Sequence, residues 1–455
     1  MRDGTTGGLD EVVDRSGAIA RHLAHAVEQL RHVNPVRVSG RVTDVIGLVI
    51  EGTGPGLPIG GVCQIERRDG GAPITAEVVG FRQNRVLLMP LGEVSGIEPG
   101  NRIVVARERP TIGVGPGLRG RVLDGLGVPL DGDGPVAVER EVPLYGPHIN
   151  PLERPPIKQP LDLGVRAMNT LLTCGRGQRL GIFAGSGVGK SALLGMIARS
   201  TRAQVNVIAL IGERGREVRE FIERDLGPEG LARSVVVVAT SDQPPLVRIR
   251  GAFLATAIAE YFRDAGLDVM LMMDSLTRLA MAQREVGLSI GEPPSARGYT
   301  PSVFAMLPKL LERARASARG AITGLYTVLV EGDDMNEHIT DAARSILDGH
   351  VVLSRALANQ GHYPAIDVLR SISRLMSEIV PEAQQQRAAR IRGWLATYRD
   401  AEDLINIGAY TAGSNPRIDE AIAKFDAIQA FLRQGLNERS TLEEGAAALA
   451  ALAGC

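Results

Sequence analysis

Ala184-Gly185-Ser186-Gly187-Val188-Gly189-Lys190-Ser191 is the stretch on which the fold assignment rests. It ends an apolar run typical of a strand, Arg179–Ala184, and precedes a helical run, Ala192–Arg199. Glycines let successive backbone N–H groups fold around an anion, and the start of the following helix adds partial positive charge. The stretch therefore predicts a phosphate-binding loop.

The last residues of this loop indicate which kind of phosphate it binds. The Lys190 ammonium can neutralise the β- and γ-phosphates of a nucleoside triphosphate, and the Ser191 hydroxyl can bind Mg²⁺. Ala184 stands where glycine is commoner, but the position tolerates a small side chain. A glycine-rich turn that binds nothing is the alternative interpretation.

Strand-like runs alternate with helical segments on the C-terminal side of the loop. Continuous aliphatic runs such as Val235–Val238 are typical of parallel strands buried on both faces, so we expect a doubly wound α/β core. The runs that predict strands of this core are Arg179–Ala184, Val205–Gly212, Ser234–Thr240, Asp268–Asp274, Ile322–Val330 and His350–Ser354.

The chain before the core has a different pattern. Apolar residues at helical spacing between Leu9 and His32 (Ile19, Leu23, Val27, Leu30) predict a short amphipathic helix. Val114–Asp133 is rich in glycine and Pro147–Pro160 in proline, so both should connect barrel and core with little regular structure. The small barrel or sandwich is predicted from short β-rich runs at Val36–Val42, Val45–Glu51, Val62–Arg67, Thr75–Phe81, Arg85–Pro90 and Arg102–Ala106.

The C-terminal part reads as helical, because no strand pattern follows Ser377. Helices are expected over Pro381–Arg399, Ile418–Gln434 and Leu442–Leu452. A chain of 455 residues exceeds what one hydrophobic core organises. We expect four parts: an amphipathic helical segment at residues 1–33, a β-barrel at 34–107, the core at 108–378 and a helical domain at 379–455.

Bulk properties exclude several classes of protein. With 51 basic against 52 acidic side chains, the net charge of -1 does not supply the overall basic field that nucleic-acid binding usually needs, which leaves only a local basic patch as an alternative. Cys63, Cys174 and Cys455 are odd in number and widely spaced, which argues against a disulfide framework and against a structural zinc site. No apolar run long enough to span a membrane and no signal peptide are apparent, so we expect a cytoplasmic protein.

Hydrolysis of a triphosphate also needs a carboxylate for the metal's water shell and a base that positions the attacking water. Asp274 ends the strand-like run Val269–Met273, at the sheet edge where ligands bind in this fold, and is the predicted metal-shell residue. The alternative is that Asp274 caps the next helix. Glu213 ends another strand, but spacing alone leaves it open between a functional carboxylate and a solvated loop residue.

Five ordered motifs together resemble the type III protein-export ATPases, relatives of the catalytic subunit of rotary ATP synthases. The motifs are Gly185–Ser191, Gly212–Glu217, Met273–Arg278, Gly291–Pro301 and Ser371–Arg374, and the resemblance extends from about Val36 to the C-terminal end. It implies ATP and Mg²⁺ as cofactors. It also implies an α/β fold with a P-loop RecA-like doubly wound core, an N-terminal small β-barrel and a C-terminal α-helical domain.

The resemblance assigns roles to four charged residues. Glu213 corresponds to the general base that polarises the attacking water. Arg214 and Arg278 match positions near the γ-phosphate and the metal, where they would orient Glu213; structural or surface ion pairs are the alternative. Arg374 matches an arginine finger that reaches the ATP of a neighbouring subunit, which implies a ring, usually a homohexamer, and turnover that rises with protein concentration.

Tyr363 matches the aromatic residue that stacks on adenine, with plain core packing as the alternative, and Tyr410 is a weaker candidate for the other face of the base. Ser191 and Asp274 are the expected metal ligands. The expected nucleotide contacts are Tyr363 and the loop residues Ala184, Gly185, Ser186, Gly187, Val188, Gly189, Lys190, Ser191 and Ala192.

Three stretches, Ile149–Pro156, Gly332–Glu337 and Leu404–Tyr410, look more like the flagellar branch than the virulence injectisome branch. The flagellar branch implies a ring associated peripherally with the inner membrane beneath an export gate. There it would help release chaperones and deliver unfolded substrates, under a dimeric negative regulator that binds the N-terminal segment.

Other functions remain as alternatives. An injectisome ATPase shares this chemistry, and so does a catalytic subunit of a rotary ATP synthase, although the helical tail lacks the acidic lever segment of that subunit. A hexameric RNA translocase fits poorly because Phe81 is the barrel's only aromatic residue. A subunit that binds nucleotide without hydrolysis is disfavoured by the presence of Glu213.

Two segments lead to hypotheses about partners. The apolar stripe of the N-terminal helix could face the regulator or a membrane surface, or could pack on the chain's own barrel. The loop Gly287–Pro301, with Glu292 and Arg297, is long enough to face the ring's channel and contact a stalk protein, or it could be a rigid structural loop.

Overall fold

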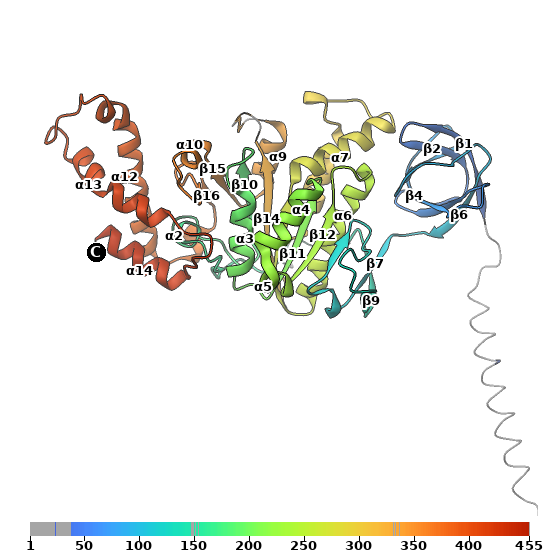
Figure 1. Cartoon of the computed structure of the whole chain (residues 1–455), viewed down its shortest axis with the longest axis horizontal. Coiled ribbons are helices and arrows are strands. Elements are labelled where there is room, and N and C mark those ends of the chain that lie inside the picture. Colours follow the sequence, from blue (N-terminus) through green and yellow to red (C-terminus); the bar gives the residue numbers. More distant parts are fainter. Residues whose placement is uncertain are drawn as a thin grey trace, which may run out of the picture.

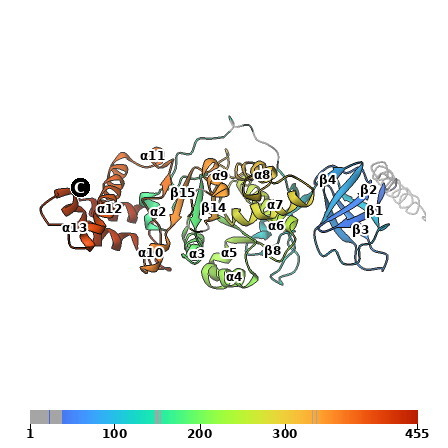
Figure 2. The ribbon, with the colours of Figure 1, turned by 90° about the horizontal axis from the view of Figure 1, so that it is seen from above.

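The computed structural model describes Leu23 and residues 38–146, 150, 152, 154–330, 332, 334, 335 and 337–454. A barrel, a central sheet with helices and a helical C-terminal part follow one another along the long axis of the molecule (Figures 1 and 2). Apart from Leu23, which is helical, the predicted helix Leu9–His32 lies outside the described residues. Within the described residues, no helix is both long and apolar enough to cross a membrane.

The N-terminal strands close into the predicted barrel, in the order β1-β2-β5-β4-β3-β6. Its interior is filled by aliphatic side chains such as Ile50, Ile65, Leu88 and Ile103, all fully buried. The strands are β1 (Ser39–Ile46), β2 (Val49–Thr53), β3 (Val62–Glu66), β4 (Ile74–Arg82), β5 (Arg85–Pro90) and β6 (Arg102–Arg107).

The first hairpin of the barrel turns later than the sequence predicted. The break expected between Val42 and Val45 is a register shift within β1, between Val42 and Asp44, and the strand continues to Ile46. The turn falls at Gly47, whose φ of +58° glycine adopts without steric strain. A bulge and a turn are hard to tell apart in sequence, because both interrupt the alternation of apolar residues.

The segment Val114–Asp133 has more regular structure than predicted, although most of its residues lie in turns and loops. β7 (Thr111–Val114) pairs with β9 (Arg140–Pro143), and η1 (Pro116–Leu118) follows β7. The short β8 (Val122–Asp124) joins the edge of the main sheet beside β12. Arg121 donates two hydrogen bonds of 2.8 Å to Asp131, which keep the pKa of the Asp131 carboxyl well below its usual range.

The core is an eight-stranded sheet in the order β16-β15-β10-β14-β13-β11-β12-β8. All pairs are parallel except β15 with β16. The six predicted core strands are confirmed, and the strands are β10 (Arg179–Ala184), β11 (Val205–Ile211), β12 (Ser234–Ala239), β13 (Asp268–Asp274), β14 (Ala321–Leu329), β15 (Gly349–Leu353) and β16 (Ile372–Ser373).

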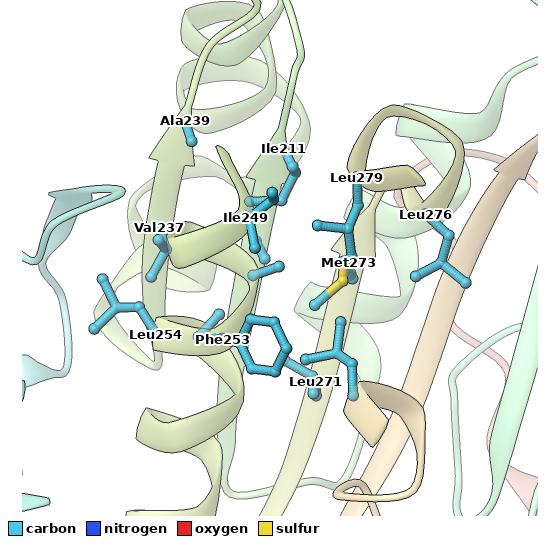
Figure 3. Packing of buried hydrophobic residues seen from close by; sticks show 14 of the residues in the cluster. Ile211, Val237, Ala239, Ile249, Phe253, Leu254, Leu271, Met273, Leu276 and Leu279 are labelled. Atoms are coloured by element: carbon cyan, nitrogen blue, oxygen red, sulfur yellow. The ribbon is translucent and has the colours of Figure 1, made fainter. Parts of the chain in front are cut away.

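Helices bury both faces of this sheet, as the continuous apolar strands predicted. Alternate residues of the parallel strands enter one cluster with α6 (Pro245–Asp264), where Ile249, Phe253 and Leu254 pack against the sheet (Figure 3). The residues between them face the second cluster, which contains α3 (Lys190–Ser200). The other core helices are α4 (Gly215–Glu220), η3 (Phe221–Leu226), α5 (Gly227–Ala232), α7 (Leu276–Ser289), η4 (Ala296–Gly298), α8 (Pro301–Leu311), α9 (His338–Ile346) and α10 (Arg355–Asn359).

The C-terminal part is helical as predicted. Its helices pack through apolar faces, and the rings of Tyr398 and Phe425 stack with centroids 3.6 Å apart. The longest helix continues beyond the predicted end at Arg399, because no glycine or proline lies between Arg399 and Gly408. The helices are α2 (Arg166–Leu171), on which the last helix packs, α11 (Met376–Ile379), α12 (Glu382–Asn406), α13 (Pro416–Leu432) and α14 (Leu442–Ala453).

Candidate active site

Three chemical features of the sequence meet at one edge of the sheet. The glycine-rich loop follows β10, Glu213 follows β11 and Asp274 ends β13. These strands are parallel and only β14 separates β10 from β13, so their carboxyl ends bring the loop and both carboxylates together. This edge is where open α/β sheets bind ligands.

The loop has the backbone that an anion cradle requires. Gly187 and Gly189 adopt φ values of +76° and +90°, which glycine reaches without strain. Ser186 and Gly187 are exposed, and α3 begins at Lys190, so the first amides of a helix of 11 residues point at the same space. Ala184 is the buried last residue of β10 and not part of the turn, which explains why a methyl group is accepted there.

Lys190 lies between the two carboxylates. Its Nζ is 2.5 Å from Oδ1 of Asp274 and 3.5 Å from Oε1 of Glu213. Ser191, the next residue, is partly buried in the first turn of α3. A hydroxyl and a buried carboxylate are oxygen ligands of the kind that Mg²⁺ prefers, so Ser191 and Asp274 could hold that metal here.

Asp274 does not cap the helix that follows it, which removes that alternative. The cap of α7 is Ser275, whose Oγ accepts a hydrogen bond of 3.3 Å from the backbone N–H of Arg278. The Asp274 carboxylate instead accepts a hydrogen bond of 2.6 Å from the Thr327 hydroxyl.

Glu213 is buried, with only 7% of its surface exposed. Burial, and secondly the charge of Asp274, raise its pKa to about 7, although Lys190 and Arg278 oppose the shift. Among the described residues, no group donates a hydrogen bond to its Oε1. This oxygen is therefore placed to accept a hydrogen bond from a ligand or water, and its pKa suits a general base.

The two arginines expected beside Glu213 differ in position. Arg278 reaches it, with Nη2 3.3 Å from Oε2, and Nη1 donates to the carbonyl oxygen of Gly212. The side chain of Arg214 is 78% exposed and lies 3.7 Å from Glu217 on α4. Only Arg278 thus contacts the buried cluster.

Sequence reasoning missed two polar residues of the cluster. Thr327 lies in the middle of an apolar run that looked like an ordinary core strand, and it is fully buried. The Glu213 carboxyl group, when protonated, donates a hydrogen bond to Glu217, which lowers the pKa of Glu217 below its usual range. The signal in both cases is weak: a hydroxyl within a buried strand, and a carboxylate one helical turn from the candidate base.

The two candidate aromatics occupy different places. Cε1 of Tyr363 lies 3.3 Å from where a Cβ would stand on Gly189, and the residue is 43% exposed, which argues against plain core packing. Tyr410 lies in the connection between α12 and α13, where its hydroxyl donates to Asp419 at 2.9 Å and lies 3.0 Å from the Asn415 carbonyl oxygen.

Arg374 lies at the amino ends of the parallel strands, whereas the glycine-rich loop lies at their carboxyl ends. It follows β16, which runs antiparallel to β15, and its backbone N–H bonds the carbonyl oxygen of Asp348 just before β15 begins. The guanidinium is 3.2 Å from the Arg344 carbonyl oxygen. Arg374 therefore faces away from the glycine-rich loop of its own chain.

Comparison with known proteins identifies the family. Residues 42–105 match the β-barrel domain of the ATP synthase alpha/beta family, and residues 164–373 match its nucleotide-binding domain. Residues 380–451 match the T3SS EscN ATPase C-terminal domain.

Two curated relatives are similar over most of their length. The "Flagellum-specific ATP synthase" of Bacillus subtilis (strain 168) is 57% identical, over 91% of this chain and 95% of the relative. The "Type 3 secretion system ATPase" of Xanthomonas euvesicatoria is 52% identical, over 89% and 91%.

A solved structure shares the whole fold. The assembled ATPase EscN from the enteropathogenic E. coli type III secretion system is 46% identical and superposes with a TM-score of 0.87, over 91% of this chain and all of EscN. Matches to three family models in order, together with this identity over most of the chain, show that it is an ATPase that belongs to the flagellum-specific ATP synthase and type III secretion ATPase family of the ATP synthase alpha/beta superfamily.

Proposed function

We propose that this ATPase hydrolyses ATP with Mg²⁺ in flagellar type III protein export, where it helps to release chaperones and deliver unfolded substrates. The observation that carries the chemistry is the cluster in which Lys190 lies between Asp274 and the buried Glu213, beside the glycine-rich loop. Identities of 57% and 54% to flagellum-specific relatives from Bacillus subtilis and Salmonella typhimurium support the flagellar assignment.

Each residue of the cluster has a task in the proposed hydrolysis. The loop amides and Lys190 bind the triphosphate, and Tyr363 stacks on the adenine. Mg²⁺, held by Ser191 and Asp274, would neutralise charge on the phosphate oxygens. Glu213 accepts a proton from the water as the water's oxygen bonds to the terminal phosphorus and the bond to the ADP oxygen breaks. Arg278 orients Glu213 through Oε2, whereas Lys190 faces Oε1.

The site is completed by a neighbouring subunit. Arg374 cannot serve its own site because it lies at the opposite edge of the sheet, so we propose that it supplies positive charge to the ATP of the next subunit in a homohexameric ring. The solved structure of an assembled EscN, a relative with the same fold, supports this arrangement. We propose no nucleic-acid partner.

Complementation between two inactive variants tests this arrangement. Arg374→Ala and Lys190→Ala should each abolish turnover alone. In a mixture, a site with intact Lys190 can receive Arg374 from a Lys190→Ala neighbour. With random mixing of equal amounts, about one interface in four carries both groups, so turnover should reappear and rise with total protein concentration. A mixture that assembles and stays inactive would show that Arg374 does not act across the interface.

Other features of the proposal concern partners and location. We propose that the ring works in the cytoplasm at the inner membrane beneath an export gate, and that the segment 1–33 binds a dimeric negative regulator. The division into residues 1–33, 34–107, 108–378 and 379–455 is part of this proposal, supported by the end of β6 at Arg107 and the start of α12 at Glu382.

The segment Gly287–Pro301 is shorter as a loop than expected, because α7 continues to Ser289. Glu292 accepts hydrogen bonds of 2.7 and 2.5 Å from the backbone N–H and hydroxyl of Ser302, so this residue has a structural role. Arg297, whose side chain is 57% exposed, is the better candidate for contact with a stalk protein in the channel. The solved complex of EscN with its central stalk EscO supports such a partner.

A second candidate is the ATPase of a virulence injectisome. It is favoured by the 52% identity to the Xanthomonas euvesicatoria secretion ATPase and by the fold shared with EscN. The proteins that co-purify with the chain, a flagellar export gate or an injectisome set, would separate the two.

A further inference from the structure

Thr327 places a hydroxyl group inside the sheet, next to the candidate metal carboxylate. It lies on β14, which is hydrogen-bonded to β10 on one side and β13 on the other. Met273 pairs with Tyr326, so Asp274 and Thr327 are the next residues along the two adjacent strands. Thr327 is fully buried, and its Oγ1 donates a hydrogen bond of 2.6 Å to Oδ1 of Asp274.

Two donors converge on the same oxygen of Asp274. Lys190 Nζ lies 2.5 Å from Oδ1, and the Thr327 hydroxyl lies 2.6 Å from it. The two donors differ in freedom of movement. The Lys190 ammonium is at the end of a long flexible side chain, at the start of α3. Thr327 is β-branched, so its χ1 is stiff, and its strand is hydrogen-bonded to a neighbour on both sides.

In the proposed hydrolysis Lys190 turns toward the phosphates, so it cannot also hold Asp274. The hydroxyl of Thr327 is then the donor that remains on Oδ1, and Oδ2 is the oxygen left to face another ligand. We propose that Thr327 is a positioning residue for this ATPase, which holds Asp274 in one orientation while Mg²⁺-nucleotide is bound. This inference rests on the proposed function, because it assumes that Asp274 serves the metal.

The competing explanation is that the hydroxyl only satisfies a buried carboxylate and stabilises the fold. The explanations differ in what they predict for metal-dependent binding. A purely structural hydrogen bond would affect nucleotide affinity equally with and without Mg²⁺. A positioning hydrogen bond would affect mainly the affinity that Mg²⁺ adds.

Thr327→Val tests the proposal because valine keeps the shape and removes the donor. ADP affinity of the full chain is measured by calorimetry in MgCl₂ and in EDTA, together with turnover over a range of Mg²⁺ concentrations. Affinity in EDTA should change by less than about twofold, and the gain on adding Mg²⁺ should shrink by roughly tenfold or more, the size expected for a hydrogen bond to a charged group. Half-saturation of turnover by Mg²⁺ should move to a higher concentration.

Two further variants serve as rescue and control. Thr327→Ser keeps the hydroxyl and should restore most of the Mg²⁺-dependent gain. Thr323→Val removes another buried hydroxyl, four residues earlier on the same strand. The Thr323 hydroxyl accepts a 2.9 Å hydrogen bond from the N–H of Gly177, at the end of the sheet away from the glycine-rich loop. This control should melt at a lower temperature and keep the full gain.

An undiminished Mg²⁺-dependent gain in folded Thr327→Val would overturn the proposal, as would a gain that serine fails to restore. If the valine variant does not fold, Thr327→Ala is measured against the same two criteria. Failure of the proposed function looks different: the unmodified chain would then bind ADP no better with Mg²⁺ than without it.

Discussion

Replacement of Glu213 by glutamine tests the chemistry of the site most directly. Glutamine has nearly the same shape and keeps an oxygen that can accept a hydrogen bond, but it cannot take a proton from water. We expect phosphate release to fall by at least about a hundredfold while ATP still binds, because the loop and Lys190 are untouched.

The pH dependence gives this prediction a magnitude. Burial raises the pKa of Glu213 to about 7, so about half of the molecules carry the ionised base at pH 7. About one tenth carry it at pH 6 and about nine tenths at pH 8. The kcat/KM of the unmodified enzyme should therefore rise about tenfold from pH 6 to pH 8. The residual activity of Glu213→Gln should lack this rise.

The same pKa predicts a change in stability. The folded state holds the Glu213 proton more tightly than the unfolded state, in which the pKa is near 4.5. The stabilisation that protonated Glu213 gives the folded state is therefore lost as pH rises from about 4.5 through about 7, and the loss is complete above that range. The pKa shift corresponds to a loss of roughly 3 kcal/mol in the free energy of unfolding. Glu213→Gln removes the buried charge, so its stability relative to the unmodified protein should be greater at pH 8 than at pH 5.

Phosphate release over a range of ATP concentrations from pH 6 to pH 8, binding of a fluorescent nucleotide, and urea unfolding at pH 5 and pH 8 measure these effects. Glu51→Gln is a matched control, because Glu51 is equally buried (7% exposed) but lies in the barrel, where it pairs with Arg85. This control should leave turnover unchanged. Turnover that survives in Glu213→Gln, or a kcat/KM that is flat between pH 6 and pH 8, would refute the assignment of the base.

Two further predictions concern nucleotide affinity and domain packing. Tyr363→Ala should raise the KM for ATP by roughly 2- to 13-fold, the loss expected for one stacking contact, while Tyr363→Phe keeps the ring and should leave KM nearly unchanged in a steady-state assay. Arg250 on α6 forms a buried ion pair with Glu77 of β4, so Arg250→Ala strands a carboxylate and should lower the free energy of unfolding by about 3–5 kcal/mol in urea titrations. The double variant Glu77→Gln, Arg250→Met should recover much of that loss; a double variant as unstable as Arg250→Ala would argue against the stranded charge as the cause.

Much of the core and of the candidate site could be predicted from the sequence, because their signals are local. The glycine loop, the continuous apolar strands and the carboxylates at strand ends each mark their own position within a few residues. Parallel strands then bring Glu213 and Asp274 to one edge without further information.

The missed features depend on residues far apart in the chain. β8 has three residues and is a strand only because it pairs with β12, more than a hundred residues later. Thr327 looked like part of an ordinary apolar strand, and only the register of β14 beside β13 places its hydroxyl against Asp274. The position of Arg374 depends likewise on the antiparallel pairing of β16, which has two residues.

The placement of Arg374 and the glycine loop at opposite edges of one sheet has a genetic consequence. In the proposed ring, every subunit takes part in two reaction sites, its own and that of one neighbour. A subunit that lacks both Lys190 and Arg374 would silence two sites wherever it is incorporated. Such an allele should therefore act dominantly in a cell that also carries an intact copy. The fraction of export that is lost should exceed the fraction of subunits that carry the substitutions.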